Sequence, residues 1–138
     1  MPKFAANLTT LFTEVPVLER FDAAAAAGFD AVELLFPYDH TPDEVAERLK
    51  ANDLQHVLIN LPSGDWTKGE RGISALPGRE DEFRDSVAKG LDYALAMQCP
   101  TVHVMAGIVE GGLSNAAAVD CYMTNLAHAA ETFGEHGI

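Results

Sequence analysis

The chain alternates four times between a short apolar run and a longer amphipathic segment, and this alternation constrains its fold more than any other feature. The short runs span residues 3–8, 30–36, 55–60 and 101–106. Each is mostly apolar instead of alternating with polar residues, which is typical of strands in a parallel sheet covered by helices. The sequence therefore predicts an α/β fold with the order βαβαβαβα.

The longer segments have the apolar spacing of helices, over residues 15–27, 41–52, 80–97 and 114–134. The second has the clearest start, because Thr41, Pro42 and Glu44 form a capping box with proline at the first helical position. The apolar positions expected to face the core are Val17, Leu18, Phe21, Ala24, Ala25, Val45, Leu49, Phe83, Val87, Leu91, Ala94, Leu95, Val119, Met123, Leu126 and Ala130.

Strand–helix alternation leaves two main architectures, an open doubly wound sheet and a closed (β/α)8 barrel. Residues 8–12 contain no glycine, so the phosphate-binding turn of a dinucleotide-binding sheet is absent after the first strand. A barrel needs about 250 residues. We therefore expect residues 1–138 to be a single domain, the N-terminal half of a (β/α)8 barrel with parallel strands, ending before its fifth strand. An open four-stranded sheet also fits the length.

The last residues repeat an earlier junction between a helix and a strand. Gly28 stands between the first helical segment and the strand at 30–36, and Gly137 follows the last helical segment in the same way. Glycine is favoured just past a helix end, because it tolerates positive φ. The repeat predicts a fifth strand at this point.

Composition excludes several classes of function. The formal net charge is −12, so the surface repels nucleic acid and anionic membranes. No apolar run approaches the roughly 20 residues of a membrane-spanning helix, and residues 1–7 lack the apolar core of a secretory signal. Cys99 and Cys121 have no metal-like spacing, so we expect reduced thiols, with a disulfide left open. We expect a cytoplasmic protein without nucleic-acid or membrane partners.

Polar residues within or just after the predicted strands are candidates for chemistry, because sites in parallel α/β proteins lie at the carboxyl ends of strands. These residues are Asn7, Glu33, His56, Asn60 and His103. Glu33 stands in an apolar strand, where a carboxylate is costly unless it is paired, hydrogen-bonded or metal-bound. A solvated position at a barrel mouth, or a pair with a nearby histidine, would also explain it. His56 and His103 are either satisfied core histidines or part of a polar pocket lining.

Segment 61–78 is long for a loop inside a compact domain, and such loops often bind or cover ligands. It holds the single tryptophan of the chain, Trp66, together with Glu70 and Arg71. Arg71 can offer a two-pronged contact to a carboxylate. We interpret the segment as a binding loop, the alternative being a surface loop that packs its own tryptophan. The glycine-rich segment 106–113 lacks the Gly-Lys-Ser/Thr of a phosphate-binding loop, and no pattern for a nucleophilic serine or cysteine occurs.

Five short motifs follow one another along the chain: FAANL at 4–8, FPYD at 36–39, NLPSGDW at 60–66, GERG at 69–72 and PGRE at 77–80. Together they resemble the hydroxypyruvate isomerase family, a branch of the xylose isomerase-like (β/α)8 (TIM) barrels, and the resemblance covers the whole chain. One departure is Ile59, which stands where relatives often have histidine and makes that wall apolar.

The resemblance implies reversible isomerisation of hydroxypyruvate to tartronate semialdehyde (2-hydroxy-3-oxopropanoate), an aldose–ketose proton shift catalysed by an intramolecular oxidoreductase. It also implies a divalent metal, with Mg²⁺ suited to carboxylate and water ligands. The family takes its metal-binding and proton-transferring carboxylates from the fifth and later strands. Within residues 1–138 we therefore expect no catalytic residue, no metal ligand and no bound cofactor, and these residues alone to be inactive.

The part of the family's pocket that maps onto this chain is a substrate-facing wall. Its expected residues are Asn7, Glu33, His56, Asn60, Trp66, Glu70, Arg71 and His103. The expected substrate is a small anionic 2-oxo acid, and Arg71 with the metal would supply positive charge for it. One alternative is a related 2-oxo-acid or sugar isomerase or epimerase of the same superfamily. The other is a non-catalytic half barrel that forms a homo-oligomer through exposed edges.

Overall fold

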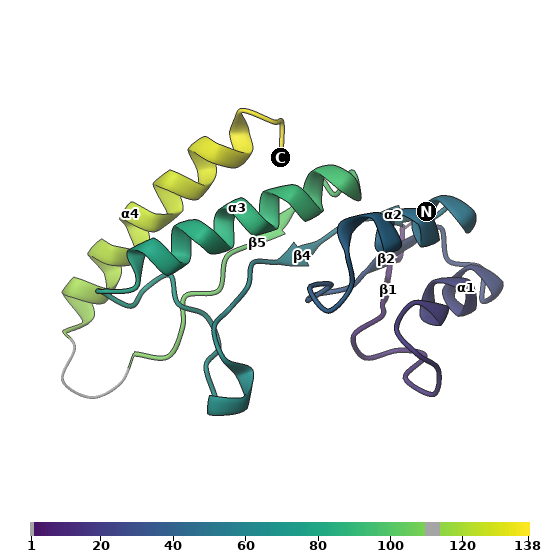
Figure 1. Ribbon diagram of the computed structural model, residues 1–138, viewed down its shortest axis with the longest axis horizontal. Coiled ribbons are helices and arrows are strands. Elements are labelled where there is room, and N and C mark those ends of the chain that lie inside the picture. The colour runs from purple at the N-terminus through teal and green to yellow at the C-terminus, as the bar shows by residue number, and fades with distance from the viewer. Residues whose placement is uncertain (1, 110–113) are drawn as a thin grey trace. The chain divides into compact units, whose positions relative to one another are not determined.

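The computed structural model describes residues 2–109 and 114–138, and the chain divides into two compact units that are described separately (Figure 1). Unit 1 consists of residues 1–59 and 92–102, and unit 2 of residues 60–91 and 103–138. Residues 110–113 of the glycine-rich segment lie outside the described residues.

Strands and helices alternate in the predicted order. The strands are β1 (Ala6–Asn7), β2 (Ala31–Glu33), β3 (Gln55–His56), β4 (Ile59–Asn60) and β5 (Val102–His103). The helices are α1 (Glu19–Ala26), α2 (Pro42–Ala51), α3 (Glu80–Ala96) and α4 (Asn115–Gly134), with a short 3-10 helix η1 (Trp66–Lys68). The α/β fold class is therefore confirmed, although the strands are shorter than predicted and α1 begins later.

The strands pair in parallel. β2 lies between β1 and β3, with Asn7 opposite Glu33 and Val32 opposite His56. The single strand predicted over 55–60 is two strands, because it changes partner along its length. The Val57 amide donates to Val32 O at 2.9 Å, whereas the Ile59 amide donates to Thr101 O at 3.2 Å, where β4 pairs with β5.

Unit 1 buries the apolar faces of α1 and α2, which contact each other (Figure 1). Phe21 and Ala24 of α1 and Val45 and Leu49 of α2 are buried as predicted, together with Val32 of β2. The capping box of α2 is also confirmed: the Glu44 amide donates to Thr41 Oγ1 at 3.3 Å, and the Thr41 amide donates to Glu44 Oε2 at 2.8 Å.

Unit 2 packs α4 alongside the first part of α3 (Figure 1). Cys121 Sγ lies 3.9 Å from Glu80 Oε1, and a Cβ on Gly90 would lie 3.6 Å from the Phe133 ring. The first contact joins the early parts of the two helices, and the second joins residues further along both. Helices α3 and α4 therefore run in the same direction, as right-handed crossovers between parallel strands require.

The predicted inward face of α4 is wrong. Val119 is 57% exposed, Met123 is 61% exposed and Ala130 is also exposed. The buried side chains are Ala118, Asn125, Ala129 and Phe133. The buried face includes the polar Asn125. Its Nδ2 donates to Ser74 O at 2.9 Å, which satisfies the buried amide.

Leu95 of α3 is likewise exposed instead of buried, since the buried stripe of this helix runs through Phe83, Val87, Ala94 and Met97. Both cysteines are free, as expected. In the described part of the chain, no helix has the length and apolar character needed to cross a membrane.

Candidate functional site

In unit 1, Asn7 and Glu33 stand side by side at the carboxyl ends of β1 and β2. Asn7 Oδ1 accepts a hydrogen bond from the Thr9 amide at 2.9 Å and closes the turn that follows β1. Glu33 is half-buried instead of fully buried, and among the described residues its carboxylate takes part in no ion pair. This placement leaves a carboxylate available at the strand ends.

His56 is buried, at 2% exposure, and it lies where the β2–β3 pairing ends. Its Nε2 accepts a hydrogen bond from the Leu34 amide at 3.1 Å, so the neutral ring carries its proton on Nδ1. That Nδ1 has no hydrogen-bond partner among the described residues. Burial lowers the pKa of His56 to about 4, which keeps the ring neutral at physiological pH.

In unit 2, Asn60 and His103 join the carboxyl ends of β4 and β5. His103 Nδ1 donates to Asn60 Oδ1 at 3.0 Å, and Asn60 Nδ2 approaches Met105 Sδ at 3.7 Å. Asn60 is buried, whereas His103 is exposed. This bond places the proton of neutral His103 on Nδ1 and leaves Nε2 as a hydrogen-bond acceptor.

Segment 61–78 is ordered into a closed loop. The Glu70 amide donates to Asp65 O at 3.1 Å, and the Asp65 amide donates back to Glu70 Oε2 at 2.6 Å. Asp65 Oδ1 also caps η1 by accepting from the Thr67 amide at 2.9 Å. Hydrogen bonds from Thr67 and Lys68 lower the pKa of Asp65 to about 2, so its carboxylate stays charged.

Trp66 and Arg71 stack on each other at this loop. The Arg71 Cζ lies 3.8 Å from the centroid of the Trp66 ring, which is a cation–π contact. Trp66 Nε1 donates to Ser63 Oγ, yet the side chain stays 44% exposed. The loop packs its own tryptophan and still presents the stack to solvent.

The cations of this loop differ in their partners. Lys68 Nζ lies 3.1 Å from Asp65 Oδ2, and Arg79 Nη1 lies 2.6 Å from Glu70 Oε1. Arg71 donates from Nη1 to the backbone oxygen of Glu70 at 2.6 Å and pairs with no carboxylate among the described residues. A carboxylate ligand would therefore meet an unneutralised guanidinium at Arg71.

Hydrogen bonds attach the base of the loop to the chain after β5. Gly72 bridges Ala106 in antiparallel fashion, and the Ala75 amide donates to Ala106 O at 2.8 Å. Gly72 has φ +117°, and a Cβ there would lie 2.6 Å from the Gly107 nitrogen, so only glycine fits this close approach.

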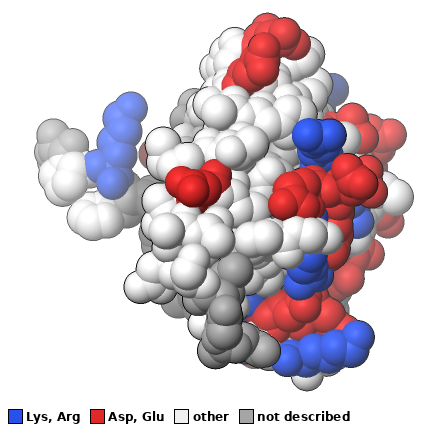
Figure 2. Space-filling view, turned by 90° about the vertical axis from the view of Figure 1, so that its left-hand side faces the viewer, with Lys and Arg blue, Asp and Glu red and all other residues white. Residues whose placement is uncertain are grey.

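Acidic and basic side chains are interspersed on the surface. At the start of α3, Arg79 pairs with Glu82 at 2.7 Å and Arg84 lies 4.0 Å from Asp81. Figure 2 shows acidic and basic side chains next to one another on one face, beside a broad area without charge.

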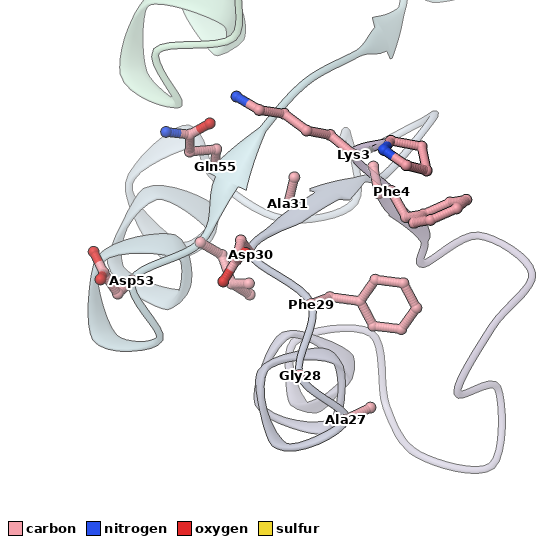
Figure 3. Close-up of a pocket in the computed structure, with 12 residues that line it drawn as sticks. Lys3, Phe4, Ala27, Gly28, Phe29, Asp30, Ala31, Asp53 and Gln55 are labelled. Atoms are coloured by element: carbon pink, nitrogen blue, oxygen red, sulfur yellow. The ribbon is translucent and has the colours of Figure 1, made fainter.

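A cavity of about 920 Å³ in unit 1 lies at the opposite edge of the sheet from Asn7 and Glu33 (Figure 3). It is lined by residues that precede the strands, including Lys3, Phe4, Asp30 and Asp53. Because ligands of parallel α/β proteins bind at the carboxyl ends of strands, this cavity is not the candidate site.

The residues present do not form a metal site. In residues 2–109 and 114–138, no three His, Cys, Asp or Glu side chains gather closely enough to hold a metal ion. A divalent metal therefore does not fit the described residues alone.

Two residues of the loop network, Asp65 and Arg79, are not among the predicted site residues. They stand in the NLPSGDW and PGRE motifs. The charges alone give a sign of this network, since Asp65, Lys68, Glu70 and Arg71 alternate in sign within a loop rich in glycine. The pair of Glu70 with Arg79 joins residues nine positions apart, however, and sequence spacing does not reveal it.

Comparison with known proteins places residues 21–138 within the model of a family described as "Xylose isomerase-like TIM barrel". Over the whole chain, the sequence is 49% identical to a 2-oxo-tetronate isomerase of Pectobacterium atrosepticum, covering 53% of that protein. A hydroxypyruvate isomerase of Escherichia coli is 45% identical over 94% of this chain and 50% of its own length.

A solved structure, titled as an AP endonuclease of family 2 from Brucella melitensis, superposes with a TM-score of 0.97 at 54% sequence identity. The match covers 100% of this chain and 53% of that one. The chain thus spans about half the length of the relatives that it matches.

Proposed function

Because the chain belongs to the xylose isomerase-like TIM barrel family, we propose that the whole protein isomerises small 2-oxo acids. The observation that carries this proposal is the agreement among relatives: proteins 45–49% identical over nearly all of this chain are named as isomerases of 2-oxo-tetronate or hydroxypyruvate. Both substrate names denote a 2-oxo acid, so the shared chemistry is a carboxylate next to a carbonyl.

The reaction that we propose for hydroxypyruvate exchanges the positions of a carbonyl and a hydroxyl group: the ketone at C2 becomes an alcohol, and the alcohol at C3 becomes an aldehyde. A base removes a proton from C3, the electrons pass through an enediol, and a proton returns to C2, so the product is 2-hydroxy-3-oxopropanoate without any external oxidant. Three residues of the described chain are suited to bind the substrate. Arg71 would receive the carboxylate, Asn60 Nδ2 would donate to a substrate oxygen, and His103 Nε2 would accept from a substrate hydroxyl.

The 2-oxo-tetronate reaction is the second candidate. It is favoured by the names of three relatives at 46–49% identity, against 45% for the hydroxypyruvate isomerase. The two substrates differ in chain length, not in the group that Arg71 would bind. Both therefore belong in one assay.

Metal dependence is part of the proposal for the whole protein. A bound divalent ion such as Mg²⁺ would stabilise the negative charge of the enediolate. The described residues contain no suitable donor set. The ligands of the ion would therefore come from other residues of the whole protein. We also propose a cytoplasmic location, because both thiols are free in the fold.

The test measures conversion of hydroxypyruvate and 2-oxo-tetronate by the whole protein, with Mg²⁺ or Mn²⁺ and after chelation. We expect turnover of at least one of the two acids. A neutral ketose and a neutral aldose of matching length serve as controls for the role of the carboxylate. Turnover of the neutral sugars alone would overturn the proposal in favour of a sugar isomerase or epimerase.

A further inference from the structure

Arg79, just before α3, is the most fully paired cation of the loop region. Its Nη1 and Nη2 donate to the two oxygens of Glu70 at 2.6 and 3.1 Å. Its Nε and Nη2 also donate to the two oxygens of Glu82, at 2.8 and 2.7 Å. Two-pronged pairs of this kind fix orientation as well as charge.

The Glu70 carboxylate is fully engaged by these contacts. Besides Arg79, its Oε2 accepts from the Asp65 amide at 2.6 Å. The same oxygen lies against Gly64, where a Cβ would collide with it and where φ is +84°. Hydrogen bonds from Arg79, and then from the Asp65 amide, lower the pKa of Glu70. Glu70 therefore stays ionised, and its oxygens are directed at Arg79 and the loop backbone.

Glu70 is also the immediate chain neighbour of Arg71. The Arg71 guanidinium already reaches the backbone oxygen of Glu70 at 2.6 Å. A Glu70 carboxylate released from Arg79 would have the guanidinium of the next residue, Arg71, as an opposite charge with which it can pair. In the structure this pair does not form, because Arg79 holds the carboxylate.

We propose that Arg79 holds Glu70 away from Arg71, so that the Arg71 guanidinium, stacked on Trp66, stays available for the carboxylate of the substrate. Glu70 and Arg79 are then positioning residues, and Glu70 does not contact the substrate. The inference rests on the proposed function, because the ligand of Arg71 is taken from it.

The test compares three variants of the whole protein with wild type. In Arg79→Gln, the freed Glu70 competes for Arg71, and the dissociation constant for hydroxypyruvate should rise about tenfold, as for one lost charge-assisted contact. In Glu70→Gln/Arg79→Gln the competing charge is gone, and binding should recover to within about threefold of wild type. Glu82→Gln is the matched control: it removes the other partner of Arg79, and binding should change less than about twofold.

A second readout needs no ligand. Trp66 reports the stack through its fluorescence, with a Trp66→Phe protein supplying the background of any other tryptophan. Acrylamide quenching of Trp66 should increase in Arg79→Gln, because Arg71 leaves the ring, and should return towards wild type in the double variant. A purely structural role of Arg79 would instead make the double variant as defective as the single variant or more so.

The two readouts separate the two ideas. Equal binding and equal quenching in Arg79→Gln and wild type would overturn the positioning role, as would a double variant without recovery. If wild type bound no hydroxypyruvate and no 2-oxo-tetronate while quenching behaved as expected, the proposed function would fail, and with it the assigned ligand of Arg71. The contact of Glu70 with Arg79 would then have a role in the loop alone.

Discussion

At the scale of single residues, the buried His56 makes stability depend on pH. Its pKa in the fold is about 4, below the ordinary value of 6.5, so the unfolded chain binds a proton more readily than the fold does. Stability should therefore fall as the pH is lowered from about 6.5 towards 4, by up to roughly 3 kcal/mol. Urea unfolding at a series of pH values measures this loss.

The comparison variant is His56→Gln, whose side-chain oxygen can still accept from the Leu34 amide but does not titrate. Its stability should decline less over the same pH range. The exposed His136 offers the matched control, since His136→Gln should follow wild type. If His56→Gln declined as steeply as wild type, protonation of His56 would not be the cause.

Arg71 carries the second prediction at this scale. Arg71→Ala should raise the KM for the 2-oxo acid about tenfold, because a charge-assisted contact to the carboxylate is lost. The metal concentration needed for half-maximal activity should stay within about twofold, since Arg71 is a cation and no metal ligand. Lys68→Ala is the control, because Lys68 already pairs with Asp65 and should affect KM little. Unchanged kinetics in Arg71→Ala would remove Arg71 from the pocket.

At the scale of elements, local signals proved more predictable than long-range ones. The start of α2 was predictable because Thr41, Pro42 and Glu44 satisfy one another within one turn. The start of α1 was placed too early, because Arg20 reaches back to Leu8 O at 2.7 Å and Val15 O at 3.1 Å and ties the preceding residues into turns. Such contacts depend on the fold and leave no mark in apolar periodicity.

Helix α4 gives the clearest test of which face is buried. Phe133→Ala should cost about 3–5 kcal/mol of unfolding free energy, because it removes a buried ring. Met123→Ala should cost less than about 0.5 kcal/mol, because that side chain is 61% exposed. Urea denaturation of both variants measures the difference. A larger loss for Met123→Ala would restore the face predicted from apolar spacing and contradict the fold of unit 2.

At the scale of the whole molecule, the family was predictable because the motifs at 60–66 and 69–72 are specific, but the site was predictable only in part. Trp66 and Arg71 were expected in a binding loop, and they do stack on each other. Glu70 was expected in the substrate-facing wall, but its residue type gave no sign of the pair that its carboxylate forms with Arg79. Residue type indicates that a loop carries charge, but only three-dimensional contacts decide which charges neutralise one another.

The last prediction concerns residues 1–138 as an isolated protein. We expect no conversion of hydroxypyruvate or 2-oxo-tetronate, because isomerisation needs a base and charge stabilisation for the enediolate, and the described residues offer no donor set for a metal. Matched relatives are about twice as long, so one of them, assayed in parallel, is the positive control.

Size-exclusion chromatography of the same sample completes this test. If the isolated chain turned over either acid with Mg²⁺ as a monomer, the prediction would be wrong, and the base would have to be sought among residues such as Glu33 and His103. If turnover appeared only in a dimer fraction, two copies would together supply what one lacks, whereas a dimer without turnover would agree with the alternative of a non-catalytic half barrel. Arg71→Ala in that dimer would then test whether the binding loop takes part.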